Sequence, residues 1–201
     1  MTPERKARIE AVLSYRQPDC TVVLENVHDP HNIAAVMRTC DAVGVQHIYI
    51  LNTKIPRHKK YGKKSSASAS GWLTIHEYQH TNACFEDLRK RYNKIYATHL
   101  GTENNSLLYE LNLTEPVALV FGNEHAGVSE EVLALCDGNF IIPQVGMIKS
   151  LNISVACAVS LYEAYRQRML AGFYENTRLS EMEYSTLAAR WGLEKERDVI
   201  Q

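Results

Sequence analysis

A short polar stretch in front of an apolar run has the clearest chemical potential in this chain. Residues 150–154 read Ser-Leu-Asn-Ile-Ser, and small apolar residues follow them. A polar side chain that is buried without a partner costs about 1–3 kcal/mol. Ser150, Asn152 and Ser154 are therefore expected both to cap a helix and to hold another group.

Further polar residues stand beside two other apolar runs. Asn32 and Arg38 come after the run TVVLEN at 21–26, and Glu124 comes just after the run VALVFG at 117–122. Taken alone, Asn32 is most simply a helix cap and Glu124 a turn carboxylate. The neighbouring alanines place Arg38 beside the apolar face of a predicted helix, where a charge needs a partner. Glu124 is the candidate partner.

Glycines cluster after the later strands rather than after the first one. Gly101, Gly122, Gly127 and Gly146 follow or lie close to the ends of predicted strands. Each alone is most simply a tight turn, but together they predict one pocket walled by main chain. The first strand lacks a following GxGxxG, and GxxxxGK[ST] does not occur. A generic nucleotide-binding α/β enzyme is therefore a weak alternative.

The elements that position these residues alternate between strands and helices. Apolar runs predict strands at 21–26, 47–51, 94–100, 117–122 and 140–143, with a further candidate at 73–78. Helical spacing predicts helices at 4–15, about 29–44, 82–92, 128–136 and 153–171. This order predicts an α/β fold with a parallel sheet covered on both faces.

The expected organisation is one main domain with a short extension at each end. The extensions are residues 1–19 and 172–201, and the domain is 20–171. The second extension has a thin apolar stripe of Met182, Leu187 and Trp191, which we expect to pack on the core or on another subunit.

Composition bounds the class of protein. The 201 residues are 45% hydrophobic and 22% charged, which is typical of a soluble globular domain. We identify neither a signal peptide nor an apolar run of the roughly 18–20 residues that a membrane helix needs. The five cysteines have no CxxC pair, which indicates reduced thiols in the cytoplasm and neither a disulfide framework nor a zinc site.

Basic residues gather in one segment although the formal net charge is only −1. Residues 54–64 read KIPRHKKYGKK and hold six Lys or Arg. Such a segment is either a solvated loop or a contact surface for a nucleic-acid backbone. The candidate RNA-binding residues are Arg8 in the first helix and Lys59, Lys60, Lys63 and Lys64.

Three stretches resemble the signature motifs of a known family in order and spacing. They are ENVHDPHNIAAVMRTCDAVG, VALVFGNEHAGVSEE and IIPQVGMIKSLNISVACAVSLYEA. They resemble the SpoU class of SPOUT RNA methyltransferases, and the two flanks look like the tRNA guanosine-2′-O-methyltransferase (TrmH) subfamily. The resemblance implies a C-terminal deep trefoil knot, bound S-adenosylmethionine, a homodimer, and methylation of a guanosine ribose in the tRNA D-loop.

The resemblance also assigns roles to residues. It implies catalytic roles for Arg38, Asn32, Glu124, Ser150 and Asn152. It implies cofactor contacts for Leu100, Gly101, Gly122, Ile142, Met147 and Leu151. The family proposal makes the arginine a proton acceptor, but a guanidinium has a pKa above about 12. We expect instead that Arg38 fixes a phosphate and stabilises the developing alkoxide.

The same motifs are compatible with two alternative functions. The first is a ribosomal-RNA ribose methyltransferase. Such enzymes often carry a separate N-terminal RNA-binding domain, whereas only about 20 residues precede the first strand here, which favours tRNA. The second is a non-catalytic RNA-binding protein that kept the fold.

Overall fold

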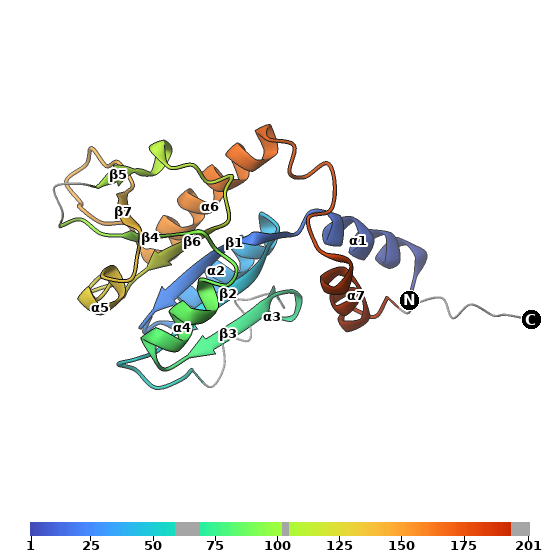
Figure 1. Ribbon diagram of the computed structural model, residues 1–201, viewed down its shortest axis with the longest axis horizontal. Coiled ribbons are helices and arrows are strands. Elements are labelled where there is room, and N and C mark those ends of the chain that lie inside the picture. Colours follow the sequence, from blue (N-terminus) through green and yellow to red (C-terminus); the bar gives the residue numbers. More distant parts are fainter. Residues whose placement is uncertain (59–68, 102–104, 194–201) are drawn as a thin grey trace, which may run out of the picture.

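A parallel sheet forms the centre of the molecule in the computed structural model, which describes residues 1–58, 69–101 and 105–193. Within these residues the sheet has seven strands (Figure 1). They are β1 (Gln17–Glu25), β2 (Val45–Leu51), β3 (Thr74–Tyr78), β4 (Lys94–Thr98), β5 (Ser106–Leu107), β6 (Val117–Phe121) and β7 (Gly138–Ile141). Their spatial order is β3-β2-β1-β6-β4-β7-β5, and all pairings are parallel.

Helices cover both faces of this sheet, and two further helices lie at one end of the molecule. They are α1 (Pro3–Ser14), α2 (Pro30–Ala42), α3 (Ala69–Trp72), α4 (Thr81–Leu88), α5 (Glu130–Leu133), α6 (Ile153–Leu170) and α7 (Glu181–Arg190), with a 3-10 turn, η1 (Leu108–Glu110). The core on one face contains residues of α2, α3 and α6, and the core on the other contains residues of α4 and α5. The expected α/β fold with a parallel sheet is confirmed.

The apolar run of β1 shows why this sequence forms a central strand. Val22 and Leu24 pack in the core beneath α2 and α6, whereas Val23 packs in the core beneath α4 and α5. Successive side chains of a strand point to opposite faces, so a strand covered on both sides needs a continuous apolar run.

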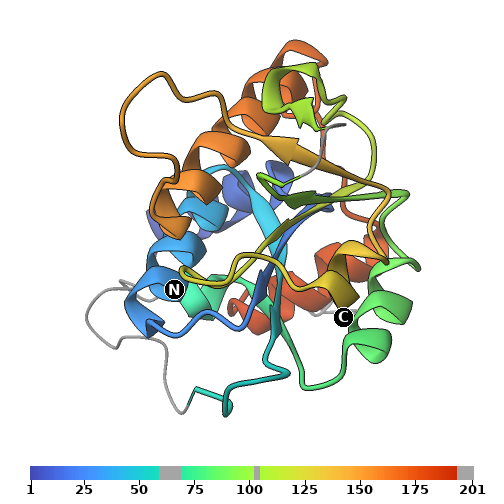
Figure 2. The same ribbon diagram turned by 90° about the vertical axis from the view of Figure 1, so that its left-hand side faces the viewer.

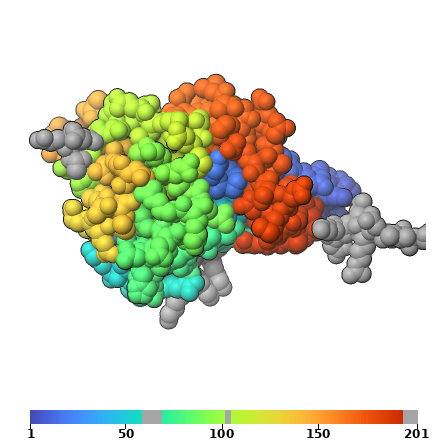
Figure 3. Space-filling view, viewed as in Figure 1, coloured from blue at the N-terminus to red at the C-terminus, as the bar shows by residue number. Residues whose placement is uncertain are grey.

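Helices α1 and α7 form a separate pair at one end of the molecule (Figures 1 and 3). Ile9, Leu13, Leu187 and Trp191 are buried together between them. The C-terminal stripe was expected to pack on the core or on another subunit, but Leu187 and Trp191 pack with α1 in a separate cluster, and Met182 is exposed. The pair lies away from the carboxyl ends of the strands.

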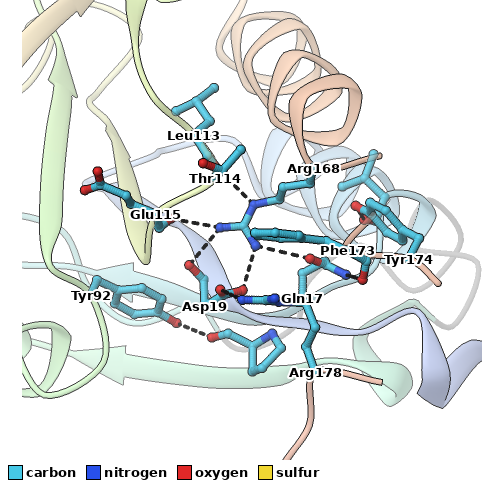
Figure 4. Close-up of polar contacts among 12 residues, drawn as sticks. Gln17, Asp19, Tyr92, Leu113, Thr114, Glu115, Arg168, Phe173, Tyr174 and Arg178 are labelled. Carbon is cyan, nitrogen blue, oxygen red and sulfur yellow. Dashed lines mark hydrogen bonds and ion pairs between the residues drawn. The ribbon is translucent and has the colours of Figure 1, made fainter. Parts of the chain in front are cut away.

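A buried arginine joins the end of α6 to the start of β1 (Figure 4). Arg168 donates hydrogen bonds to the carbonyl oxygens of Leu113 and Glu115 at 2.8 and 2.9 Å. It also donates to Oδ1 of Asp19 at 2.6 Å, and Arg178 binds the other carboxylate oxygen. Burial alone would raise the pKa of Asp19, but the two guanidinium groups outweigh it and hold that pKa below its usual value. This cluster was not predicted.

Several predicted boundaries differ from the observed ones. The first strand begins at Gln17 rather than 21, because Gln17 already pairs with Val45 of β2. Residues 17–19, expected in the N-terminal extension, therefore belong to the sheet. The helix expected at 128–136 is only α5, which ends at Leu133 and begins after Ser129, whose side chain caps it by accepting from the backbone N–H of Val132. The helix expected at 82–92 ends at Leu88, and α3, β5 and η1 were not predicted.

The five cysteines are all free thiols, and four of them are buried. Burial raises the pKa of Cys40 and of Cys157, which lie in the core that α2 and α6 share. Neither is a thiolate nucleophile at neutral pH. In the described parts of the chain, no helix combines the length and apolar character needed to span a membrane.

Candidate active site

The loops at the carboxyl ends of the strands bring three sequence motifs together. Figure 2 looks onto this edge of the molecule. Asn32 lies in the first turn of α2 after β1, Glu124 lies in the loop after β6, and Asn152 precedes α6 after β7. Ligands of parallel α/β sheets bind at this edge, as the sequence pattern predicted.

A chain of hydrogen bonds joins these three side chains. Nδ2 of Asn152 donates to Oδ1 of Asn32 at 3.2 Å. Nδ2 of Asn32 then donates to Oε1 of Glu124 at 2.8 Å. Asn32 is thereby fixed in one amide orientation, because one end accepts and the other donates. The three motifs, far apart in sequence, form one connected polar unit.

Asn152 also begins helix α6. Its Oδ1 accepts from the backbone N–H of Ser154 at 2.9 Å and from the Ser154 hydroxyl at 2.6 Å. Asn152 is therefore the N-cap, and it serves both as a cap and as a link to Asn32, as the polar stretch led us to expect. Ser150 is exposed two residues earlier and is not part of this hydrogen-bonded unit.

Arg38 lies further along α2 and is exposed at the surface. The sequence placed it beside the apolar face and paired it with Glu124. In the structure Glu124 accepts from Asn32, and Arg38 does not require a buried counter-charge because it is exposed. An exposed guanidinium can bind a phosphate of a partner with two donors.

Two asparagines that the sequence-based site omitted hold the loops in place. Asn26 has a positive φ of 49°, a conformation that asparagine tolerates better than most residues. Its Oδ1 accepts from the backbone N–H of Lys54 at 2.8 Å, and its backbone carbonyl accepts from Nδ2 of Asn123 at 2.8 Å. Asn26 ends the predicted strand at 21–26 and Asn123 directly follows the one at 117–122, and these positions are the signal that marks them.

The residues expected to contact a cofactor occupy three neighbouring strand ends. β6, β4 and β7 are adjacent in the sheet, so Gly122, Gly101 and Ile142 follow strands that lie side by side. The N–H of His99 just beyond β4 donates to the carbonyl of Phe140 in β7 at 3.3 Å. The late strand ends therefore lie side by side, and the pocket walled by main chain that the glycines predicted there stays a prediction.

Exposed apolar side chains surround the same strand ends. Leu100 is 63% exposed, Met147 is 99% exposed, and Leu151 is also exposed. Large apolar side chains grouped on a surface indicate a site that another group covers. This chemistry fits an adenosine-bearing cofactor, whose ring offers apolar faces.

Gly122 was expected to line a ligand pocket, but its own turn already leaves no room for a side chain. A Cβ there would lie 2.1 Å from the carbonyl carbon of Gly127 and 2.2 Å from the backbone nitrogen of Val128. The turn between Gly122 and Gly127 therefore closes on its own backbone. Gly127 has a φ of +69°, which favours glycine for a second reason.

Of the candidate RNA-binding residues, the structure describes only Arg8. Lys59, Lys60, Lys63 and Lys64 lie outside the described residues. Arg8 is exposed on α1, at the other end of the molecule from the polar unit (Figure 1). Within one subunit, Arg8 is therefore remote from Asn32, Glu124 and Asn152.

Comparison with known proteins places these features in a family. The model of the SpoU rRNA Methylase family matches residues 19–162. A tRNA (guanosine(18)-2′-O)-methyltransferase of Thermus thermophilus is 44% identical over 192 residues, which cover 94% of this chain and 96% of that protein. A 23S rRNA (guanosine-2′-O-)-methyltransferase of Haemophilus influenzae is 31% identical and matches over 80% of this chain but 65% of its own length.

Solved structures agree with these sequence matches. The crystal structure of the A. aeolicus TrmH/SpoU tRNA modifying enzyme superimposes with a TM-score of 0.86 at 36% identity, covering 98% of each chain. The SpoU methyltransferase AviRb from Streptomyces viridochromogenes, in complex with the cofactor AdoMet, gives 0.63 at 26% identity, covering 78% of this chain and 62% of that chain. This chain belongs to the SpoU rRNA Methylase family.

Proposed function

We propose that this protein transfers a methyl group from S-adenosylmethionine to the ribose 2′-hydroxyl of a guanosine in the D-loop of tRNA. The observation that carries the proposal is the hydrogen-bonded unit of Asn152, Asn32 and Glu124 at the carboxyl edge of the sheet. The tRNA methyltransferases that resemble this chain match it over almost its whole length, whereas the ribosomal-RNA relative matches over less.

The apolar side chains at the late strand ends would hold the cofactor. Leu100, Met147 and Leu151 are exposed there beside the backbone of Gly101, Gly122 and Ile142. S-adenosylmethionine, when bound, supplies a methyl group on a positively charged sulfur. The protein then has to hold the ribose oxygen in line and to exclude water.

Arg38 would act on the substrate through its fixed positive charge. A ribose 2′-hydroxyl is a weak acid and becomes a good nucleophile only as negative charge develops on its oxygen. An exposed guanidinium can bind the adjacent phosphate with two donors and stabilise that charge. Proton acceptance by Arg38, as the family proposal has it, would need a neutral guanidinium, which is chemically demanding.

The polar unit would position the ribose beside Arg38. Glu124 and Asn32 hold each other in one orientation, and Asn152 locks the far end of Asn32. Such preorganised groups lower the barrier because they need no rearrangement during the reaction. Ser150, exposed on the same loop, would contact the substrate or the cofactor once they are bound.

The knot implied by the family resemblance is also part of the proposal. β7 is inserted between β4 and β5 and pairs with both. The segment that follows β7 therefore leaves the sheet beside the connection from β4 to β5, which supports threading of the chain at this place. An experimental structure whose backbone contains no knot would refute this part of the proposal.

A homodimer is proposed from the outer face of α6. Val155, Tyr162 and Met169 are exposed and follow one another at intervals of seven residues, which places them on one side of the helix. A stripe of this kind fits a second copy of the same helix. Sedimentation at micromolar concentration tests this, and a single monomeric species would refute it.

The basic segment is proposed to bind the tRNA backbone. Replacing Lys59, Lys60, Lys63 and Lys64 by Gln removes four positive charges. The slope of log K against log salt for tRNA binding should then become shallower, by up to about 0.9 for each phosphate that the protein no longer neutralises. An unchanged slope would remove these residues from the interface.

Identification of the methylated nucleoside tests the function itself. Purified protein is incubated with methyl-labelled S-adenosylmethionine and unmodified tRNA, with ribosomal RNA in parallel, and the RNA is digested and analysed by mass. Label in 2′-O-methylguanosine from the tRNA D-loop is the expected result. Label in ribosomal RNA alone would overturn the substrate, and no label despite cofactor binding would favour a non-catalytic RNA-binding protein.

A further inference from the structure

A cavity of about 500 Å³ opens between the loops that follow β1 and β6. Its lining residues are Glu25, Asn26, His28, Lys54, Asn123, Ala126, Gly127, Val128, Ser129, Glu130 and Glu131. Helix α2 follows β1 on one face of the sheet, and α5 follows β6 on the other. The cavity therefore lies where the connections diverge, which is the preferred ligand position in a parallel sheet.

The cavity adjoins the polar unit of the proposed active site. Asn123 lines it, and the next residue is Glu124, which accepts from Asn32. His28 lines it from the other side and comes just before Asp29, the N-cap of α2. A nucleoside whose ribose lies at Asn32 and Glu124 would thus have its base beside this cavity.

Most of the polar groups that line the cavity are already committed to the protein. Asn26 donates to Thr53 and accepts from Lys54. Asn123 donates to the carbonyl of Asn26 and accepts from the N–H groups of His125 and Ala126. These amides hold the loops and have little capacity left for a ligand.

Glu25 is different. It is only 2% exposed, yet in the part of the chain that the structure describes no cation pairs with it. Its Oε2 accepts from the N–H of Ser129 at 2.9 Å, and its Oε1 accepts from Nδ2 of Asn26 at a long 3.4 Å. A carboxylate can accept about four hydrogen bonds. A buried charge normally has a partner, so Glu25 has capacity for donors of a ligand in this cavity.

We propose that the cavity receives the guanine base of the target nucleoside and that Glu25 accepts hydrogen bonds from its N1–H and its 2-amino group. The inference rests on the function proposed above. Guanine presents these two donors side by side on its Watson–Crick edge, which a carboxylate can accept together. The lining holds three carboxylates, Glu25, Glu130 and Glu131, against one lysine, Lys54, and this excess of negative charge disfavours a phosphate there. Glu25 is thus assigned as a specificity-determining residue.

The test compares two substrates and three proteins. tRNA transcripts carry either guanosine or inosine at the target position, because inosine lacks only the 2-amino group. The wild-type protein should methylate guanosine with a kcat/KM roughly tenfold to hundredfold above that for inosine. In Glu25→Gln this ratio should fall towards one, because the amide nitrogen cannot accept a hydrogen bond. Glu86→Gln, an exposed change on α4, should keep the wild-type ratio.

The substrate ratio separates base recognition from a structural role of Glu25. Loss of its bond to Ser129 would lower activity on both substrates equally and leave the ratio unchanged. If Glu25→Gln does not fold, Glu25→Asp keeps the charge but withdraws it by one methylene, and its ratio should also fall. A wild-type ratio near one, or an unchanged ratio in folded Glu25 variants, would overturn the inference. Absence of guanosine methylation by the wild type would refute the proposed function instead.

Discussion

Two arginines in this molecule sit in opposite surroundings. Arg168 is 1% exposed and is bound by backbone carbonyls and by Asp19 at the junction of α6 and β1 (Figure 4). Arg38 is exposed on α2, six residues after Asn32. The first arrangement satisfies a buried guanidinium completely within the protein, whereas the second keeps a guanidinium at the surface, where we propose that it binds the substrate.

The polar groups near Arg168 and those of the candidate active site also differ in what they connect. Those near Arg168 tie together the start of β1, the segment before β6 and the chain beyond α6. Those near the active site form a short chain of three side chains that are not buried. We infer that the first cluster stabilises the fold and that the second serves the reaction. Substitutions in each cluster can separate these two roles.

Arg38→Ala should have the largest effect on turnover. The variant loses the charge that stabilises the developing alkoxide, so kcat should fall by at least roughly a thousandfold. The free energy of unfolding should change by no more than about 0.5 kcal/mol, because the side chain is exposed. Single-turnover methylation and calorimetric cofactor binding measure the two effects. Lys90→Ala, another exposed cation, is the control, and normal turnover of Arg38→Ala would refute its role.

Arg168→Ala should have the largest effect on stability. Removing the guanidinium takes a donor from the Asp19 carboxylate and from three backbone carbonyls, so the free energy of unfolding should fall by about 3 kcal/mol or more. Urea unfolding measures it. Arg178→Ala, which removes the more exposed partner of Asp19, should cost only about 1 kcal/mol. Equal losses in the two variants would show that burial of Arg168 does not matter.

Asn152 allows its two roles to be separated by two substitutions. Asn152→Ala should cost about 1 kcal/mol of stability, because α6 loses its N-cap. Asn152→Asp keeps a good cap but cannot donate to Oδ1 of Asn32, so stability should be kept while kcat falls by roughly tenfold. Thermal unfolding and single-turnover rates distinguish the two. Full activity of Asn152→Asp would show that the link to Asn32 is dispensable.

The smallest expected effect is a dependence of stability on acid pH. The pKa of Asp19 is lowered in the folded state, and an unfolded aspartate titrates near about 3.9. The stability that the Asp19 carboxylate contributes is therefore fully present above that pH and is lost as the pH falls through the folded-state pKa. Urea unfolding at several pH values below about 4 should show a shallower slope in Asp19→Asn than in the wild type. Equal slopes would assign the acid sensitivity to other carboxylates.

Sequence patterns predicted the parts of the fold that depend on continuous apolar runs. β1 and β6 are buried on both faces, and their runs identified them. Short elements such as α3 and β5 carry no such signal, because two to four residues are too few to show a period. The start of β1 was missed because its first residues are polar and are paired by the buried Arg168.

The structure joins three of the candidate site residues by hydrogen bonds, whereas their catalytic roles stay a prediction. Asn32, Glu124 and Asn152 were identified from their places after strands and from the family motifs. Their hydrogen-bonding order was not, because Glu124 was assigned to Arg38 and proved to accept from Asn32. Side-chain partners depend on how loops from separate strands meet, and spacing along the chain does not contain that information. Asn26 and Asn123 stand at the ends of predicted strands, but the hydrogen bond between them was not predicted for the same reason.

The central claim is that Asn32 and Glu124 act as one unit, and a double-mutant cycle tests it most directly. Single-turnover kcat/KM is measured for the wild type, Asn32→Ala, Glu124→Ala and the double variant under the same conditions. Each single change breaks the same 2.8 Å hydrogen bond. The account therefore predicts that kcat/KM of the double variant is only slightly below that of the less active single variant. Losses that simply multiply would contradict it, since they would show that the two residues act independently.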